Sequence, residues 1–494
     1  MANIGSMPPL DRRTKLAYGS GAIANGVKNV AFSGFLMFFY NQVIGVPAAI
    51  VSVALAATLL MDAIVDPFLG RWSDTVSTRW GRRHPFIYAA LIPTPIFFTL
   101  VWFPPAGLSD TGTAVWLFCT AVATRFAISA FEINTQAMTA ELTEDYRART
   151  ALFSLRYWFL YLGQYGFSAA ALLVFFTATD EYPMGQLNPE SYTGFALLGG
   201  AMIFVSILLC GIGTHNRIPW LRQSEPRKKG GVRQHFREMG AAFGNRGFLT
   251  IFSFGVFKFT AIGLYAATAL YFNTYLFRLE PAQIAILTID SVLAATIAAP
   301  LAPIMSQRFG KKESSLGFAL IGVLLGTAPL YLSYFDLFFV AGDPLLLPTL
   351  FVIGAIYGAM VAISLINTSS MLADVVEDSA VTTGRRDAGT FFAAASFMQQ
   401  CSTALGLALN GIILTIAAFP EKVSMAQVTE PMMDSLIATY CIAAIGLWFV
   451  GAIFLAFYPI TRERHERNVA ILEARRAEAV ARTAEETPAA GAAL

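Results

Sequence analysis

Residues 61–85 read MDAIVDPFLGRWSDTVSTRWGRRHP, an apolar helix with two acids that runs into a basic turn. Asp62 and Asp66 are four residues apart, so both carboxylates project from one helix face, about 6 Å apart along the axis. An ionisable side chain inside a membrane span costs roughly 3 kcal/mol or more, and such residues usually face a wet interior. The stretch therefore predicts a transmembrane helix whose acidic face lines the path of an ion or a solute.

The composition agrees with a membrane protein. Of the 494 residues, 56% are hydrophobic and 13% are charged, whereas a soluble domain has about 25% charged residues. The net charge is +2, and the basic residues gather in short loops, so we expect no nucleic-acid partner. The cysteines and histidines show no metal-ligand or nucleophile spacing, and no Walker-type phosphate loop occurs. We expect a transporter that is neither an enzyme nor ATP-driven, with no cofactor beyond a coupling ion.

Apolar stretches long enough to span a bilayer recur along the chain. Their number predicts an all-α integral membrane protein with twelve transmembrane helices. The stretches are residues 15–42, 47–70, 85–104, 113–141, 150–178, 193–213, 247–277, 281–304, 315–335, 346–372, 390–418 and 434–459.

Loop charges predict the orientation. Arginines and lysines follow helices two, four, six, eight and ten, whereas the alternate loops carry mainly acids. The positive-inside rule then places both termini in the cytoplasm, in the plasma (inner) membrane. The basic residues lie at 71–83, 147–149, 217–246, 308–312 and 385–386.

The chain divides into two similar halves. AELTED at 140–145 is echoed by ADVVED at 373–378, and WGRRHP at 80–85 by FGKKES at 309–314. Two six-helix repeats joined by a polar loop predict a major facilitator fold, with substrate near mid-membrane between the halves. The expected units are an N-terminal bundle (1–213), a cytoplasmic loop (214–246), a C-terminal bundle (247–460) and a cytoplasmic tail (461–494).

Five motifs resemble one family over most of the chain. They are LAYGSGAIANG at 16–26, MDAIVDPFLG at 61–70, STRWGRRHPFI at 77–87, AELTEDYRART at 140–150 and ADVVEDSAVTTGRRDAGTFF at 373–392. The sequence is similar to the glycoside-pentoside-hexuronide:cation symporters of the major facilitator superfamily, of which melibiose permease is the best-known member. The D-x-x-x-D-P-x-x-G block is the most specific part of the resemblance.

The resemblance implies a coupling-ion site for Na+ or H+ at Asp62, Asp66 and Glu132, and a sugar-binding arginine at Arg156. Other positions depart from the family pattern. The first-helix sugar-binding aspartate falls on Gly26, the helix-four tryptophan on Gln136 and the helix-eleven lysine on Gln400. The coupling site is therefore expected to be retained, whereas melibiose is not the expected substrate.

Several cations lie within apolar helices, and two interpretations stay open for them. At least two could simply neutralise the acids, and Glu132 could pair with Arg125 two turns away on its own helix. Unpaired cations would instead favour an anionic substrate. Tyr157 and Tyr161 could stack on a sugar or pack in the core. The substrate-site candidates are Arg156, Lys28, Arg125, Gln136, Tyr157, Tyr161, Lys258 and Gln400.

The basic loops carry candidate gating residues, whose ion pairs would form in the outward-facing state and break on the switch. The simpler alternative is that these charges only set the topology. Asp290, a lone acid on the eighth helix, favours a satisfied core or rim position over a ligand. The gating candidates are Asp74, Arg79, Arg82, Arg83, Glu141 and Asp145 in the first half, and Asp374, Arg385 and Arg386 in the second.

The function predicted from these observations is cation-coupled symport of a sugar or glycoside by alternating access. Intramembrane cations favour an anionic substrate such as a hexuronide. The alternative is a carrier of a lysolipid or another amphiphilic organic anion with the same fold. We expect a monomer whose partners are its small-molecule substrate and the bilayer, and the choice between Na+ and H+ stays open.

Overall fold

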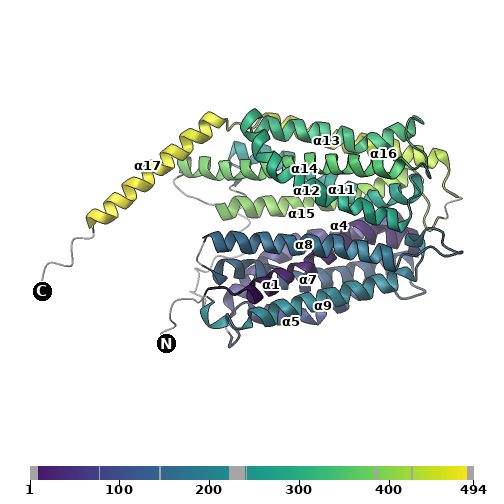
Figure 1. The fold of residues 1–494 in the computed structure, drawn as a ribbon, viewed down its shortest axis with the longest axis horizontal. Coiled ribbons are helices and arrows are strands. Elements are labelled where there is room, and N and C mark those ends of the chain that lie inside the picture. Colours follow the sequence, from purple (N-terminus) through teal and green to yellow (C-terminus); the bar gives the residue numbers. More distant parts are fainter. Residues whose placement is uncertain are drawn as a thin grey trace.

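The computed structural model describes residues 9–76, 78–143, 146–221, 240, 242–383, 388–423 and 427–486. These residues form a long helical bundle in which the two halves of the chain lie against each other (Figure 1). The first described helix begins, and the last one projects, at one end of the bundle, which we call the basic end because the loop at residues 79–83 lies there; the opposite end is the far end. The predicted all-α fold is confirmed.

The first half begins with a crossing built from five short pieces. Asp11 caps it by accepting a hydrogen bond from the Thr14 backbone (3.2 Å), and Gly45, at φ +98°, ends it in the left-handed conformation that glycine adopts freely. The elements of this half are α1 (Arg12–Ser20), α2 (Ala22–Val30), η1 (Ala31–Phe35), α3 (Leu36–Phe38), η2 (Phe39–Ile44), α4 (Ala48–Thr75), α5 (His84–Leu91), α6 (Pro93–Leu100), α7 (Asp110–Leu142), α8 (Tyr146–Val174), η3 (Gly185–Leu187), α9 (Ser191–His215) and η4 (Ile218–Trp220).

The second half repeats the pattern and ends in a helix that projects from the basic end (Figure 1). Gly310, at φ +93°, makes the sharp turn between two of its long helices. The elements are α11 (Arg246–Tyr271), η5 (Phe272–Leu276), α12 (Pro281–Phe309), α13 (Lys311–Tyr334), α14 (Leu346–Thr383), α15 (Ala388–Ile416), α16 (Glu430–Ala456) and α17 (Arg462–Glu486).

Ten helices in the described part of the chain are long and apolar enough to cross a membrane. The third predicted crossing is split at Ile92 into α5 and α6, because Pro93 cannot donate a helical hydrogen bond. The fifth crossing, α8, is less apolar, since Arg147, Arg149 and Arg156 lie in its first three turns. Several helices also run beyond their predicted limits, most clearly α14, which continues to Thr383.

Glycines set the closest helix crossings, and they do so in the same way in both halves. A Cβ on Gly26 of α2 would lie 2.1 Å from the Leu160 carbonyl oxygen of α8. A Cβ on Gly406 of α15 would lie 2.3 Å from the Thr260 carbonyl oxygen of α11. Small residues allow such close backbone approach between membrane helices. The α2–α8 and α11–α15 crossings thus correspond in the two repeats.

The halves meet through α4 against α15 and α8 against α12. At the far end, hydrogen bonds cross between them. The Tyr271 hydroxyl donates to Asn41 Oδ1 (2.9 Å), and the Tyr275 hydroxyl donates to Gln42 Oε1 (2.7 Å). Gln186 Nε2 donates to Thr274 Oγ1 (3.1 Å). The far end is therefore held closed in this conformation.

Candidate functional site

Asp66 lies on the face of α4 that meets α15. Gln400 Nε2 of α15 donates to Asp66 Oδ2 (3.2 Å), which is a contact between the two halves. Asp66 Oδ1 and Gln400 Oε1 are buried and have no well-aligned hydrogen-bond donor among the described residues, and the Ser129 hydroxyl of α7 lies beside the Asp66 carboxylate. Among the residues that the structure describes, no lysine, arginine or histidine forms an ion pair with Asp66. Buried oxygens without well-aligned donors suit a hard cation or a proton.

Asp62, one turn earlier on α4, is in a different environment. Arg125 Nη1 of α7 donates to Asp62 Oδ2 at 2.5 Å, and both side chains are nearly buried. The guanidinium also lies over the Phe32 ring, 5.2 Å from its centroid. Arg125 is therefore engaged by an acid, and it pairs with Asp62 rather than with Glu132 on its own helix.

Glu132 is the acceptor for three side chains. Its Oε1 accepts from Asn25 Nδ2 (2.6 Å), Gln136 Nε2 (2.9 Å) and Arg156 Nη2 (3.4 Å). One oxygen of Glu132 therefore accepts hydrogen bonds from side chains of α2, α7 and α8. Arg156 also donates to Thr135 Oγ1 at 3.0 Å. The Asn25 Oδ1 atom is buried without a hydrogen-bond partner in the described part of the chain.

Lys28 lies between these groups. It is within electrostatic range of Asp62, Asp66 and Glu132, yet it forms no ion pair shorter than 4.0 Å within the described ranges. The structure thus brings together three acids (Asp62, Asp66, Glu132) and three bases (Lys28, Arg125, Arg156), which we call the charged site. Fully ionised, this set of side chains is neutral.

Gly26, where the resembling family has a sugar-binding aspartate, leaves no space for a side chain. Its Cβ would lie 2.1 Å from the Leu160 oxygen and 2.7 Å from the Gln164 nitrogen. The backbone of α8 therefore occupies the volume that a carboxylate would need. The sugar site of this protein must be built from other residues.

Lys258 lies apart from the charged site. Its ammonium is buried in the second half, donates to Thr368 Oγ1 (3.2 Å) and lies over the Phe254 and Phe259 rings. No acid within the described ranges forms an ion pair with it. Hydroxyl and cation–π contacts replace an anionic partner here.

Tyr157 and Tyr161 are exposed residues of α8. Their side chains are 59% and 45% exposed, so they do not fill a packed core. Tyr165, one turn further, stacks on Tyr161 with ring centroids 6.0 Å apart. We call Tyr157, Tyr161 and Tyr165 the tyrosine ladder; it begins beside Arg156.

The gating candidates of the first half form a compact ion cluster. Arg82 and Arg83 both contact Glu141, and Arg83 Nη2 lies 2.8 Å from Asp74 Oδ1. Arg79 lies over the Trp80 ring at 5.3 Å. All these residues belong to one half, so their opening and closing during transport stays a prediction.

The second cluster of gating candidates involves α17. Asp374 binds Lys311 (2.7 Å) and His465 (3.3 Å), and Arg464 donates twice to Asp378 (2.8 and 2.9 Å). The remaining candidates, Asp145, Arg385 and Arg386, lie outside the described residues.

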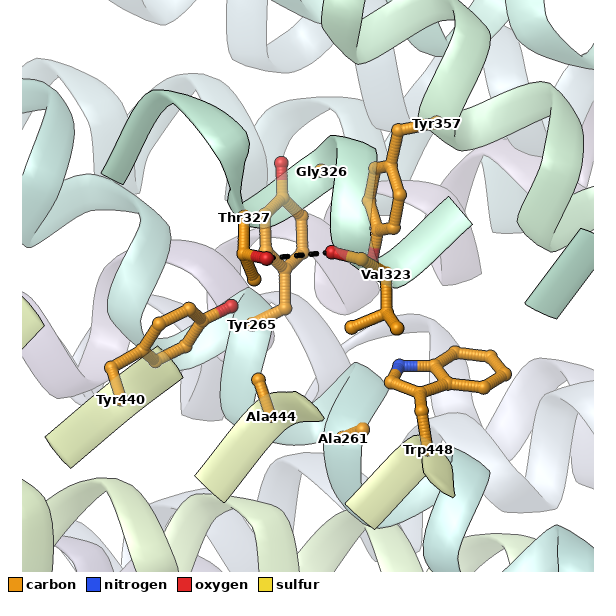
Figure 2. Close-up of a pocket in the computed structure, with 9 residues that line it drawn as sticks. All are labelled: Ala261, Tyr265, Val323, Gly326, Thr327, Tyr357, Tyr440, Ala444 and Trp448. Atoms are coloured by element: carbon orange, nitrogen blue, oxygen red, sulfur yellow. Dashed lines mark hydrogen bonds between the residues drawn. The ribbon is translucent and has the colours of Figure 1, made fainter. Parts of the chain in front are cut away.

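A small pocket lies inside the second half, among α11, α13, α14 and α16. Figure 2 shows the Tyr265 and Tyr357 rings side by side at this pocket, with the Tyr440 hydroxyl turned toward them. Its lining is aromatic and weakly polar: Ala261, Tyr265, Val323, Gly326, Thr327, Tyr357, Tyr440, Ala444 and Trp448.

Two six-helix repeats, a closed far end and a group of intramembrane acids, one of which contacts the other half, define a secondary transporter of the major facilitator fold. The chain belongs to the MFS/sugar transport protein family, whose sequence model matches residues 17–462.

Named relatives agree with this family. The chain is 26% identical to the uncharacterized symporter sll1374 of Synechocystis sp., over 92% of this chain and 95% of the relative. It is 24% identical to the glucuronide carrier protein homolog of Escherichia coli, over 94% and 96%. It is 23% identical to the isoprimeverose transporter of Lactiplantibacillus pentosus, over 91% and 88%.

Solved structures agree in fold. The xylose transporter XylE of E. coli in an inward-open conformation matches with a TM-score of 0.60 at 14% identity, over 92% of this chain and 98% of that chain. The nucleoside transporter NupG matches with a TM-score of 0.58 at 13% identity, over 91% and 99%.

Proposed function

We propose that this protein is a cation-coupled symporter of a glycoside, with both termini in the cytoplasm and a preference for an anionic sugar such as a hexuronide. The observation that carries the proposal is Asp66: a carboxylate within a membrane span, at the contact between the halves, with one buried oxygen that has no well-aligned hydrogen-bond donor among the described residues. Such groups mark ion paths. The names of the symporter, glucuronide and isoprimeverose relatives support the same substrate class.

The coupling ion binds at Asp66, either as a proton or as Na+. For Na+, the buried amide oxygens of Asn25 and Gln400 are further candidate ligands. Asp62 and Glu132 already accept hydrogen bonds from arginines. They therefore contribute negative charge near the ion and are not its direct ligands. Gln400 belongs to the second half, so ion binding between Asp66 and Gln400 depends on the relative position of the two halves.

Ion and substrate strengthen each other's binding through charge. The charged site is neutral when ionised, and one bound cation makes it positive. An anionic substrate then restores neutrality near Lys28 and Arg156. The coupling is reciprocal, so substrate must tighten ion binding by the same factor. The loaded carrier then rocks from one open side to the other.

The proposal is tested by uptake into proteoliposomes under separate sodium and proton gradients. The panel is a set of glucuronides, neutral glycosides and lysolipids. We expect gradient-driven accumulation of a glucuronide, and its loss in Asp66→Asn, while energy-independent exchange persists. Asp434→Asn, an exposed acid near the start of α16, is the matched control. Unchanged accumulation in Asp66→Asn would refute the assignment of the coupling site to Asp66. Uptake of lysolipids alone would refute the proposed substrate class in favour of the lysolipid alternative.

A further inference from the structure

Asp290 is an acid in the middle of α12, and no cation in the described part of the chain balances its charge. Its hydrogen bonds among described residues come from one neighbour, Ser291, through the side chain (Oγ to Asp290 Oδ1, 2.9 Å) and the backbone, and no ion pair involves it there. The other oxygen lies against α14, where a Cβ on Gly354 would be 2.1 Å from Oδ2. A carboxylate placed so within a membrane span needs a wet or ligand-filled neighbour.

Three helices surround this carboxylate from both halves of the protein. Tyr265 of α11 lies within electrostatic range of Asp290, Tyr357 and Tyr165, and Tyr165 of α8 lies close to Ser291. The rings of Tyr265 and Tyr357 touch edge to face, with centroids 5.6 Å apart (Figure 2). Asp290 thus faces the region between the halves, where carriers of this fold bind substrate.

The tyrosines here differ from six buried tyrosines elsewhere in the bundle. Tyr18, Tyr40, Tyr192, Tyr271, Tyr275 and Tyr458 all hydrogen-bond to protein groups. A buried tyrosine hydroxyl usually finds such a partner. Tyr161 and Tyr265 are instead 45% and 43% exposed, and in the described part of the chain their hydroxyls and that of Tyr357 hydrogen-bond to no residue. Free hydroxyls around an uncompensated carboxylate are suited to a polyhydroxylated ligand.

The distance along the bundle between the charged site and Asp290 sets the length of a ligand that contacts both. Tyr165 follows Arg156 by nine residues on α8, which corresponds to about 13.5 Å along the helix axis and to two and a half turns, so the two side chains leave opposite faces of α8. The tyrosine ladder, which starts at the residue after Arg156, spans this axial distance. A ligand that reaches from the charged site to Asp290 is longer than a single sugar ring.

We infer that Asp290, Gly354, Tyr265 and Tyr357 form a second sugar subsite, which binds the hydroxyl groups of the outer ring of a two-ring glycoside. The carboxylate accepts hydrogen bonds from neighbouring hydroxyls, and the tyrosine rings stack on the ring face. This inference rests on the proposed function and names which glycosides the carrier prefers. Gly354 holds the carboxylate in place by leaving room for it.

The test uses three probes with the same anionic head: glucuronate, phenyl β-glucuronide and cellobiouronate, in which the second ring is a glucose. Binding is measured as ligand-induced thermal stabilisation of the purified full-length protein, and transport as gradient-driven uptake. We expect wild type to bind cellobiouronate at least tenfold more tightly than glucuronate, with phenyl glucuronide between them. A hydrogen bond to a charged group accounts for about 10- to 100-fold in affinity.

Two variants remove the subsite in different ways. Asp290→Asn removes the charge, and Gly354→Ala displaces the carboxylate without changing it. Both should reduce cellobiouronate affinity at least tenfold and leave glucuronate unchanged. Asp434→Asn and Gly446→Ala are the matched controls, since a Cβ on Gly446 meets nothing within 4 Å. The double variant Tyr265→Phe with Tyr357→Phe should give a smaller loss, with Tyr334→Phe as its control.

The outcomes separate this subsite from the coupling site. If wild type takes up glucuronate by a gradient but shows no preference for cellobiouronate, the subsite is wrong and the proposed function stands. The subsite is also wrong if the preference persists in both Asp290→Asn and Gly354→Ala. If none of the three probes binds or is taken up, the proposed substrate class fails and the subsite fails with it.

Discussion

The Asp62–Arg125 pair allows a direct measurement of what a buried ion pair contributes to this bundle. The two side chains are 12% and 8% exposed, and their nearest atoms are 2.5 Å apart. Charge centres about 4 Å apart attract by about 4 kcal/mol at an effective dielectric constant of 20. Removing one partner of a buried pair costs about 3–5 kcal/mol, mainly because the other charge is left without compensation.

We therefore expect Arg125→Met alone to lower the free energy of unfolding by about 3 kcal/mol. This expected loss lies at the lower limit of the range for buried pairs, because Lys28 lies within electrostatic range of Asp62 and compensates part of its charge. The double variant Arg125→Met with Asp62→Asn removes both charges and should recover most of that loss. The predicted coupling energy of the cycle is at least about 2 kcal/mol.

The assay is equilibrium unfolding in mixed micelles, followed by circular dichroism, for all four members of the cycle. The control cycle uses Arg462 and Glu466, an i,i+4 pair on α17 whose side chains are 76% and 61% exposed. An exposed pair of this kind should couple by about 0.5 kcal/mol. If the buried cycle were additive within about 0.5 kcal/mol, the reasoning that assigns Arg125 to Asp62 would be refuted.

Three further perturbations follow from the helix contacts. Gly26→Ala places a Cβ against the α8 backbone and should destabilise the fold by about 1–3 kcal/mol in the same unfolding assay, whereas Gly34→Ala, with open space around it, should be neutral. Arg464→Ala removes both bonds to Asp378 and should speed limited proteolysis of α17 with little effect on uptake; unchanged proteolysis would contradict this. Gln42→Ala breaks cross-half bonds at the far end and should widen spin-label distances there, and an unchanged distribution would argue against this closure.

The sequence predicted the apolar helical spans because that property is local. A span of apolar residues, a basic loop and a repeated motif are each readable within a short window. The pairing of charges is not local. Glu132 lies two turns from Arg125 on one helix, which suggested a pair, yet Arg125 reaches across to Asp62 on α4. Helix rotation and depth decide such contacts, and they depend on close crossings such as that at Gly26.

Two residues of the site carried too weak a signal in the sequence. Asn25 is neutral and was not a site candidate, yet the structure gives it the shortest hydrogen bond to Glu132, at 2.6 Å. Asp290 was visible as a lone acid, and a lone acid favoured a satisfied core position. What changes its interpretation is the absence of a described cation beside it and the free hydroxyls of Tyr265 and Tyr357, which come from distant parts of the chain.

The sign of the substrate charge can be argued without knowing the coupling ion. Protonation of Asp66 removes one negative charge from the charged site, and Na+ beside Asp66 adds one positive charge, so both leave the site with a net charge of +1. Lys28 then has less negative charge around it and attracts an anion in either case. We expect glucuronate uptake to exceed that of its neutral methyl ester under whichever gradient drives transport. A preference for the ester would mean that Lys28 stays engaged with the acids after the ion has bound.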